Sequence, residues 1–172
     1  MTSNQQPVTG NGKSPRIGHG YDIHRLKPGG TLVLGGVDVG GELSVIAHSD
    51  GDVVYHALVD ALLGAIGAGD IGELFPDSDA RWKDAASRLF VEEAVRRVHE
   101  AGFAVANADV TILAERPKLK TFKAKMRANL EVLLHAPANV KAGTNEAVDA
   151  VGRGEAIAAH AVVLLVPGAQ QP

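Results

Sequence analysis

Asp22 and His24 are the first residues whose types and spacing could do chemistry. They lie in a segment whose aromatic and β-branched content predicts a strand, and residues two apart on a strand point to the same face. A carboxylate oxygen and an imidazole nitrogen brought together in this way are two ligands that zinc accepts. The alternative, two polar residues that face solvent at a strand end, stays open on the local sequence alone.

His56 lies within Val53 to Ile66, a stretch that is apolar nearly all round and is predicted to form a buried helix. A histidine there must either hydrogen-bond its ring nitrogens or coordinate an ion. With Asp22 and His24 it would complete three protein ligands and one open position, the pattern of a catalytic zinc site. The alternative is a core histidine bonded to Asp60 or to the backbone. Asp60, one turn along, is also our candidate for orienting the His56 ring around a metal.

Two loops could bind ligands or could simply be solvated. His48 to Asp52 precedes the predicted helix, where free N–H groups and an imidazole suit a phosphate oxygen, but Ser49 and Asp50 would serve equally well as capping residues. The segment from Gly69 onward concentrates carboxylates that could hold sugar hydroxyls or a divalent ion, namely Asp70, Glu73, Asp77 and Asp79.

Three further patterns place charged or hydroxyl side chains beside predicted strand ends. Six basic residues within 116–127 are typical of a solvated helix face, but Lys118 falls at a strand-to-helix junction, where ligands often bind. Thr144 and Glu146 follow an apolar strand and could meet a phosphate and its metal, or could form a plain turn. Arg153, between two glycines, could be structural or could present its guanidinium to an anion.

Composition narrows the class of protein. The chain has 172 residues, 45% apolar and 22% charged, as in an ordinary globular domain with its own core. The net charge of −3 offers no basic excess, so we expect neither a nucleic-acid nor a membrane partner. Without cysteine, a metal site must use His, Asp and Glu. No membrane span or targeting segment is visible, and we expect a cytoplasmic location.

The hydrophobic pattern predicts the elements that must position these residues. We expect strands near 16–26, 105–114, 139–143 and 156–166, a hairpin at 31–39, helices at 53–66, 85–101 and 117–135, and a loop or short helix at 144–152. This order predicts an α+β domain with helices on one face of a mixed sheet. Residues 1–15 are predicted to be a disordered extension, and residues 16–168 a single domain.

Taken together, these segments resemble the 2-C-methyl-D-erythritol 2,4-cyclodiphosphate synthase family of the non-mevalonate isoprenoid pathway. The matching segments stand in the family's order, span 16–165 and read RIGHGYDIHRL, LGG, AHSDGDVVYHALVDALLGAIGAGDIGELFPDSD, ADVTILAERPK and GRGEAIAAHAVVLL. The resemblance implies a ferredoxin-like fold assembled as a homotrimer with active sites between subunits. It also implies a phosphorus–oxygen lyase. In its reaction the 2-phosphate of 4-diphosphocytidyl-2-C-methyl-D-erythritol 2-phosphate attacks the β-phosphorus of the same molecule, and CMP leaves.

The resemblance also implies roles for individual residues. Asp22, His24 and His56 correspond to zinc ligands, the first two beside the substrate. His48 and Thr144 correspond to catalytic residues that stabilise the transition state. The carboxylate that holds a second divalent ion, magnesium or manganese, on the diphosphate corresponds to Glu146. Further substrate contacts correspond to Ser49, Asp70, Ile71 and Gly72, with Phe75, Asp77 and Asp79 nearby. The family's cytidine pocket corresponds to Ala114 to Lys120, which includes Lys118. Arg153 corresponds to a residue that lines a central trimer cavity.

One loop departs from the family pattern, which usually reads T-T-T-E and then L-G-F-T before G-R-G-E. Here Gly143 and Asn145 replace hydroxyl residues, a change that predicts weaker binding of the CMP moiety. Ala150 replaces the family's Phe, and Asp149 adds a carboxylate where an anion would lie. We therefore predict weak or absent binding of isoprenoid diphosphates in the trimer cavity, an expectation that micromolar affinity for geranyl diphosphate in calorimetry would overturn.

Two rival functions fit parts of the same pattern. A zinc phosphodiesterase or diphosphohydrolase would use water at the same His₂Asp zinc and release open-chain phosphates. A non-catalytic trimer with structural zinc would bind a cytidine nucleotide and turn nothing over. The joint presence of Asp22, His24, His48, His56, Thr144 and Glu146 favours the cyclising enzyme.

Overall fold

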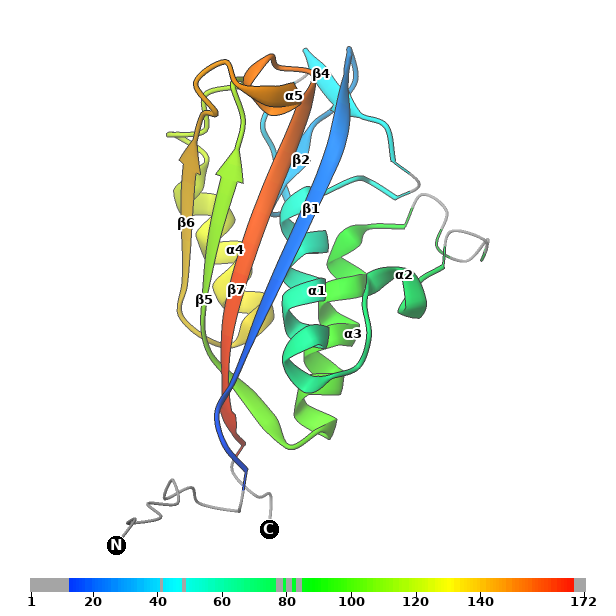
Figure 1. Cartoon of the computed structure of the whole chain (residues 1–172), viewed down its shortest axis with the longest axis vertical. Helices are drawn as coiled ribbons and strands as arrows, with labels where there is room; N and C mark the ends of the chain where they lie inside the picture. The colour runs from blue at the N-terminus through cyan, green and yellow to red at the C-terminus, as the bar shows by residue number, and fades with distance from the viewer. Residues whose placement is uncertain are drawn as a thin grey trace, which may run out of the picture.

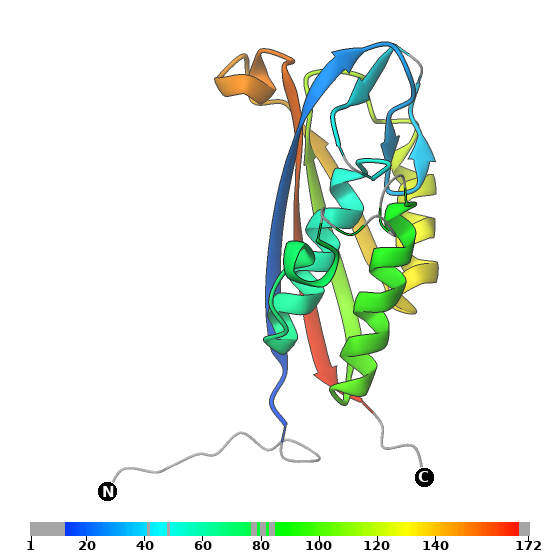
Figure 2. The ribbon, with the colours of Figure 1, turned by 90° about the vertical axis from the view of Figure 1, so that its right-hand side faces the viewer.

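The computed structural model describes residues 13–168 except 41, 48, 77, 78, 80, 81, 83 and 84. Within them, a five-stranded mixed sheet has the order β4-β1-β7-β5-β6, and helices cover one of its faces (Figures 1 and 2). Only the β5–β6 pair is parallel. The sheet strands are β1 (Arg16–Pro28), β4 (Leu43–Val45), β5 (Phe103–Leu113), β6 (Ala138–Gly143) and β7 (Ala156–Pro167). The expected mixed sheet with helices on one face is thus confirmed.

The described residues contain three longer helices and two single helical turns. The longer ones are α1 (Val53–Ile66), α3 (Ser87–Glu100) and α4 (Lys123–Leu134), and the short ones are α2 (Ile71–Leu74) and α5 (Asp149–Gly152). A two-stranded hairpin, β2 (Val33–Leu34) and β3 (Val37–Asp38), turns at the expected glycine pair. None of the described helices is long and apolar enough to cross a membrane.

Helix α1 lies directly against β1, and two glycines on that strand make the approach possible. A Cβ atom on Gly18 would lie 1.8 Å from the carbonyl oxygen of Ala61, and one on Gly20 would lie 1.9 Å from that of Ala57. Any side chain there would clash with helix backbone, which cannot move aside as a flexible side chain can. The glycines therefore set the distance between the strand that carries Asp22 and the helix that carries His56.

The start of α1 is held by a buried carboxylate. Asp52 is the N-cap, and its Oδ1 accepts from the backbone N–H groups of Val54 and Tyr55 at 3.0 and 3.3 Å. The same carboxylate accepts from Gly35 and Gly36 in the hairpin at 2.9 and 2.7 Å. Burial nevertheless raises the pKa of Asp52 to about 6. One side chain thus fixes both the helix terminus and the hairpin beside it.

Three elements differ from the sequence prediction. Helix α4 begins at Lys123 and not at Pro117, because residues 119–122 form a turn closed on the Leu119 carbonyl and the helix has no side-chain cap that would mark its start. The acidic loop contains the single turn α2, and β4 was not expected because three residues carry too little alternation to be recognised. The remaining predicted strands and helices are confirmed to within two residues at each end.

The sheet face opposite the helices carries large exposed apolar side chains. Ile17, Tyr21 and Ile23 of β1 are 72%, 45% and 43% exposed, and Val162 of the neighbouring β7 is 43% exposed. Among the described residues, only the short α5 lies on this side, at one end of the sheet (Figure 2). An apolar face of this kind is typical of a surface that another subunit covers.

Candidate metal centre and active-site cleft

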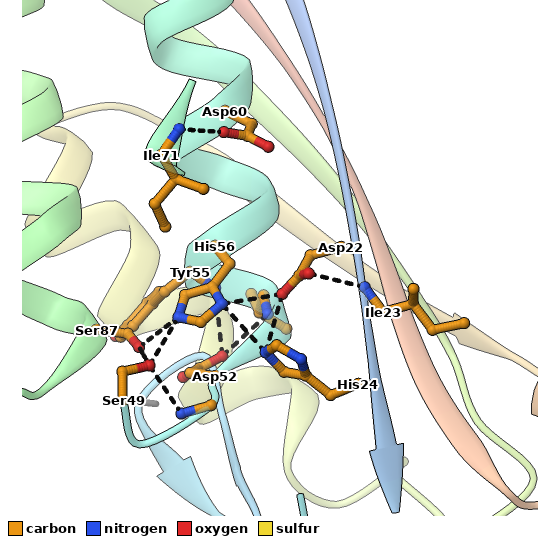
Figure 3. A network of polar contacts seen from close by, with 12 residues as sticks. Asp22, Ile23, His24, Ser49, Asp52, Tyr55, His56, Asp60, Ile71 and Ser87 are labelled. Carbon is orange, nitrogen blue, oxygen red and sulfur yellow. Dashed lines mark hydrogen bonds and ion pairs between the residues drawn. The ribbon is translucent and has the colours of Figure 1, made fainter. Parts of the chain in front are cut away.

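Asp22 and His24 of β1 meet His56 of α1 in one cluster (Figure 3). Their nearest ligand atoms all lie within 4.8 Å of one another. His56 Nδ1 lies 2.9 Å from Asp22 Oδ2, and His24 Nε2 lies 3.2 Å from both of these atoms. The expected convergence of strand and helix is therefore present, and the alternative of two solvent-facing strand residues is wrong.

The cluster has the character of a divalent-metal site. One carboxylate oxygen and two imidazole nitrogens form the donor set of many three-ligand zinc centres with an open fourth position. The side chains of Asp22, His24 and His56 are 23%, 17% and 12% exposed, so the site is shielded but reachable. Their donor atoms are already gathered, which lowers the cost of ordering them around an ion.

Burial and mutual charge act in opposite directions on this cluster. Burial alone would raise the pKa of Asp22, but the hydrogen bond from His56 and the charges of the two histidines outweigh it and hold that pKa below its usual value. Burial lowers the pKa of His24, and Asp22 offsets only part of that effect. A carboxylate beside neutral imidazole is the protonation state in which these groups bind a cation.

A second layer of polar groups lies behind His56 and was not foreseen from the sequence. His56 Nε2 lies 2.9 Å from Ser87 Oγ and 3.1 Å from Ser49 Oγ (Figure 3). Ser87 Oγ also makes a short hydrogen bond to Asp50 Oδ1. The only local signal for Ser87 was a hydroxyl at the start of a helix, which usually indicates a cap.

Asp60 does not orient His56, contrary to the prediction. Its Oδ1 accepts from the backbone N–H of Ile71 at 2.8 Å, so it fixes the start of α2. Burial raises the pKa of Asp60. Spacing of four residues placed it one turn from His56, but the ring turns toward β1 and α3, and the sequence could not give that rotamer.

The metal cluster forms the floor of a cleft of about 330 Å³. One wall is aromatic, with the rings of Phe75 and Phe90 stacked at 4.4 Å and Trp82 edge-on to both. Ser49 faces the cleft beside the metal ligands. Among the substrate contacts expected from the resemblance, those that line this cleft are Asp22, His24, Ser49, Ile71, Gly72 and Phe75.

A second cavity, of about 340 Å³, lies at the β6 edge of the sheet. It contains the residues predicted to form a cytidine pocket, with Ala114, Lys118, Lys120 and Thr144 among its lining. At its rim, Thr144 Oγ1 donates to Glu146 Oε1 at 2.8 Å. The structure thus brings the basic residues together with the hydroxyl and carboxylate that follow β6.

The two cavities are separated along the width of the sheet, the first beside β1 and the second beside β6. Asp22 pairs with Ala159, Ala159 with Ile112, and Ile112 with Ala142, one residue before Gly143. Three interstrand spacings therefore separate the metal cluster from the strand end before Thr144, or about 14 Å. The predicted site residues are gathered into two groups within one chain, not into one.

The other predicted site residues have different positions. His48 and Asp77 lie outside the described residues, and Asp79 lies in the loop after α2. Asp70 is the N-cap of α2, where its Oδ1 accepts from the N–H of Glu73 at 2.9 Å. Arg153 pairs with Glu155 through its Nε at 2.9 Å, on the exposed turn after α5.

The chain is a mixed α/β domain in which a carboxylate and two imidazoles converge in a cleft as a candidate divalent-metal site. The YgbB family model matches residues 15–166, so the chain belongs to the YgbB family. A chloroplastic 2-C-methyl-D-erythritol 2,4-cyclodiphosphate synthase of Oryza sativa subsp. japonica is 51% identical over 154 residues, which cover 88% of this chain and 69% of the relative. The predicted family is confirmed.

Solved structures agree with this assignment. The bifunctional IspDF of Campylobacter jejuni aligns with a TM-score of 0.86 and 41% identity over 90% of this chain, which spans 42% of that longer one. IspF of Plasmodium falciparum, in a complex with CDP, aligns with a TM-score of 0.79 and 35% identity over 90% of this chain and 97% of its own. The residues matched by the family model, 15–166, include those of the metal cluster and of the second cavity.

Proposed function

We propose that this chain converts 4-diphosphocytidyl-2-C-methyl-D-erythritol 2-phosphate to 2-C-methyl-D-erythritol 2,4-cyclodiphosphate with release of CMP. It is an enzyme of the lyase class in isoprenoid biosynthesis, an assignment supported by the names of its relatives. The single observation that carries it on the structural side is the convergence of Asp22, His24 and His56 at the floor of a cleft. The reaction needs no protein nucleophile, because the 2-phosphate of the substrate is the attacking group.

Zinc is the ion we assign to this cluster, since its donors are one carboxylate and two imidazoles. Bound there, it would supply Lewis acidity to the β-phosphate. Asp22, His24 and His56 would hold it. Ser49, which lines the cleft, would orient a phosphate oxygen, and His48 is proposed to stabilise charge in the transition state. Catalysis by these residues is positioning and charge neutralisation.

The second cavity is proposed to bind the cytidine end of the substrate. Lys118 and Lys120 give it positive charge, and Ala114 leaves room beside them. The CDP complex of the Plasmodium falciparum relative supports a cytidine diphosphate ligand. Thr144 would contact the phosphates, and Glu146 would hold a second divalent ion, magnesium or manganese, on the diphosphate.

We further propose a homotrimer of ferredoxin-like subunits whose active sites lie between neighbours. A diphosphate is much shorter than the roughly 14 Å that three interstrand spacings place between the metal cluster and the strand end before Thr144. A second copy could bring its β6 edge to the metal cleft of the first. The exposed apolar face that includes Ile17, Ile23 and Val162 supports such an assembly, because its burial against other copies would stabilise the trimer.

Other carried-over roles belong to the same proposal. Ile71, Gly72 and Phe75 are assigned to the sugar portion of the substrate because they line the metal cleft. Asp70, Asp77 and Asp79 would contact ribose or erythritol hydroxyls near them, and Arg153 would contact an anion in the trimer cavity. A cytoplasmic location also stays a prediction, since the rice relative is chloroplastic.

The central cavity is expected to bind isoprenoid diphosphates weakly. A hollow of about 410 Å³ on the uncovered sheet face is lined by Asp149, Ala150 and His160, among others. The Asp149 carboxylate accepts from the N–H groups of Val151 and Gly152 at 2.8 and 3.1 Å, and these bonds lower its pKa. A fixed negative charge at this wall would oppose a diphosphate.

The test is a product assay on protein loaded with zinc and magnesium, followed by phosphorus NMR. Equal amounts of CMP and cyclic diphosphate, both abolished in His56→Ala, would support the proposed reaction. Open-chain phosphates would identify a hydrolase at the same metal. Nucleotide binding without turnover by folded, metal-loaded protein would identify a non-catalytic binding protein. His99→Ala, at an exposed position of α3, serves as a control histidine outside the metal cluster.

A further inference from the structure

Ser87 links the metal cluster to a carboxylate that has no contact with the cleft. It is the first residue of α3, is fully buried, and places its Oγ 2.9 Å from His56 Nε2. The Asp50 carboxylate binds Ser87 twice, because one oxygen accepts the hydroxyl and the other accepts the backbone N–H at 3.1 Å. The N-cap residue Ala86 makes no side-chain bond, so Asp50 takes over the capping of α3.

The donor and acceptor types fix the direction of the hydrogen bonds that run from His56 through Ser87 to Asp50. A carboxylate only accepts, so the Ser87 hydroxyl donates to Asp50 and its oxygen is left to accept from His56 Nε2–H. With a cation held between Nδ1 and Asp22, the proton of neutral His56 would then reside on Nε2, and the Nδ1 lone pair would face the ion beside Asp22 and His24. That is the tautomer in which His56 ligates a metal on the Asp22 side.

We propose that Asp50 and Ser87 are positioning residues that hold His56 in its metal-binding tautomer and orientation. The proposal rests on the proposed metal function. Its second part concerns Ser49, which also reaches His56 Nε2, at 3.1 Å, but lines the cleft. Because the buried Ser87 satisfies Nε2 permanently, the Ser49 hydroxyl is free to turn to a substrate phosphate without leaving the imidazole unpaired.

The first experiment measures zinc affinity by chelator competition in Ser87→Ala and Asp50→Asn. Loss of an outer partner of a metal-bound histidine typically weakens metal affinity 10–100-fold, and we expect that range for both variants. Asp50→Asn is nearly isosteric. We expect its amide oxygen to keep the backbone N–H of Ser87 and its NH₂ to face the Ser87 hydroxyl, which would reverse the hydrogen-bond direction and favour the wrong His56 tautomer.

Three further measurements separate positioning from a merely structural role. The double variant should bind zinc no more weakly than the single variant with the larger loss, because both changes break the same chain of hydrogen bonds. Ser87→Thr keeps the hydroxyl and should restore affinity to within a few-fold of the wild type. The visible absorption of bound Co²⁺ should change in Ser87→Ala and not in Ser44→Ala, a control serine on β4. Thermal unfolding of the metal-free variants confirms that each is folded.

The outcomes are distinguishable. Zinc affinity within twofold of the wild type in both folded single variants would overturn the positioning role of Asp50 and Ser87 while leaving the metal function intact. Equal weakening by Ser49→Ala and Ser87→Ala would overturn the distinction between a permanent and an exchangeable partner. A wild-type protein that binds neither zinc nor cobalt would overturn the proposed metal function itself, and with it the positioning role of Asp50 and Ser87.

Discussion

The two edges of the sheet differ in how completely one chain builds them. At the β1 edge, the three donor residues are already in contact, are backed by Ser87 and Asp50, and lie against a helix packed to within backbone contact. At the β6 edge, the lysines and Thr144 line an open cavity with exposed side chains, and Thr144 donates to Glu146. Metal binding demands fixed ligands from rigid elements, whereas a nucleotide site can be completed by ligand or by a neighbouring subunit.

The largest expected effect tests the rigid edge. Gly20→Ala should lower the free energy of unfolding by about 3 kcal/mol or more, because the added Cβ would lie 1.9 Å from the Ala57 carbonyl oxygen. Gly143→Ala at the open edge should be neutral or stabilising by up to about 1 kcal/mol, since its Cβ meets nothing within 4 Å. Chemical denaturation of both variants measures the contrast, and equal effects would remove the distinction between the edges.

Removal of a metal ligand should have the next largest effect. His24→Ala should weaken zinc binding by more than about 100-fold, because loss of an outer partner alone costs 10–100-fold. Chelator competition measures the change in zinc affinity. Turnover should be lost both in His24→Ala and in wild-type protein from which zinc has been removed. His99→Ala, at an exposed position of α3, is the matched control and should bind zinc normally. Unchanged affinity in His24→Ala would exclude the cluster as the zinc site.

The open edge should respond to loss of charge. Lys118→Ala should weaken CMP binding by about tenfold, the lower end for a charged hydrogen bond, because the cavity is exposed. Lys125→Ala, on α4 but not in the cavity lining, should bind CMP as the wild type does. Isothermal titration calorimetry compares the two, and an equal loss in both would indicate a diffuse field and not a nucleotide pocket.

Restoring the family's hydroxyl should have a smaller, opposite effect. Gly143→Thr should tighten CMP binding about 2–10-fold, the value of one neutral hydrogen bond, since open space surrounds the added Cβ. Gly143→Val has the same shape without the hydroxyl and should leave the affinity unchanged. If calorimetry finds the valine variant as tight as the threonine variant, packing and not the hydroxyl sets the affinity.

The smallest expected effect concerns an ion pair near the open edge. Lys141 and Asn139 hold the pKa of Asp109 below its usual value, so this contribution to stability is present above pH 4 and is lost as the pH falls through the lowered pKa. Both side chains of the Asp109–Lys141 pair are more than one third exposed, so the effect should stay below about 0.5 kcal/mol. Thermal unfolding between pH 5 and 3 should show a shallower decline in Asp109→Asn.

Much of the fold and the metal cluster could be predicted from the sequence. The run from Val53 to Ile66 gave both bounds of α1 correctly, because its apolar surface, preceding capping residues and following glycines are local signals. Asp22 and His24 could be paired because strand periodicity is local too. The predicted start of α4 was wrong, because a turn closed on the Leu119 carbonyl precedes the helix and no side-chain cap marks its first residue.

The sequence by itself determined the types of donor, the strand and helix that carry them, and the family, because these depend on neighbours along the chain. Only the tertiary structure decided the partners of those donors. It turned Asp60 to Ile71, brought Ser87 and Asp50 behind His56, and set the metal cluster about 14 Å across the sheet from the strand that ends before Thr144. Such choices depend on rotamers and on strand order, which arise from packing between segments distant in the chain and leave no periodic trace in it.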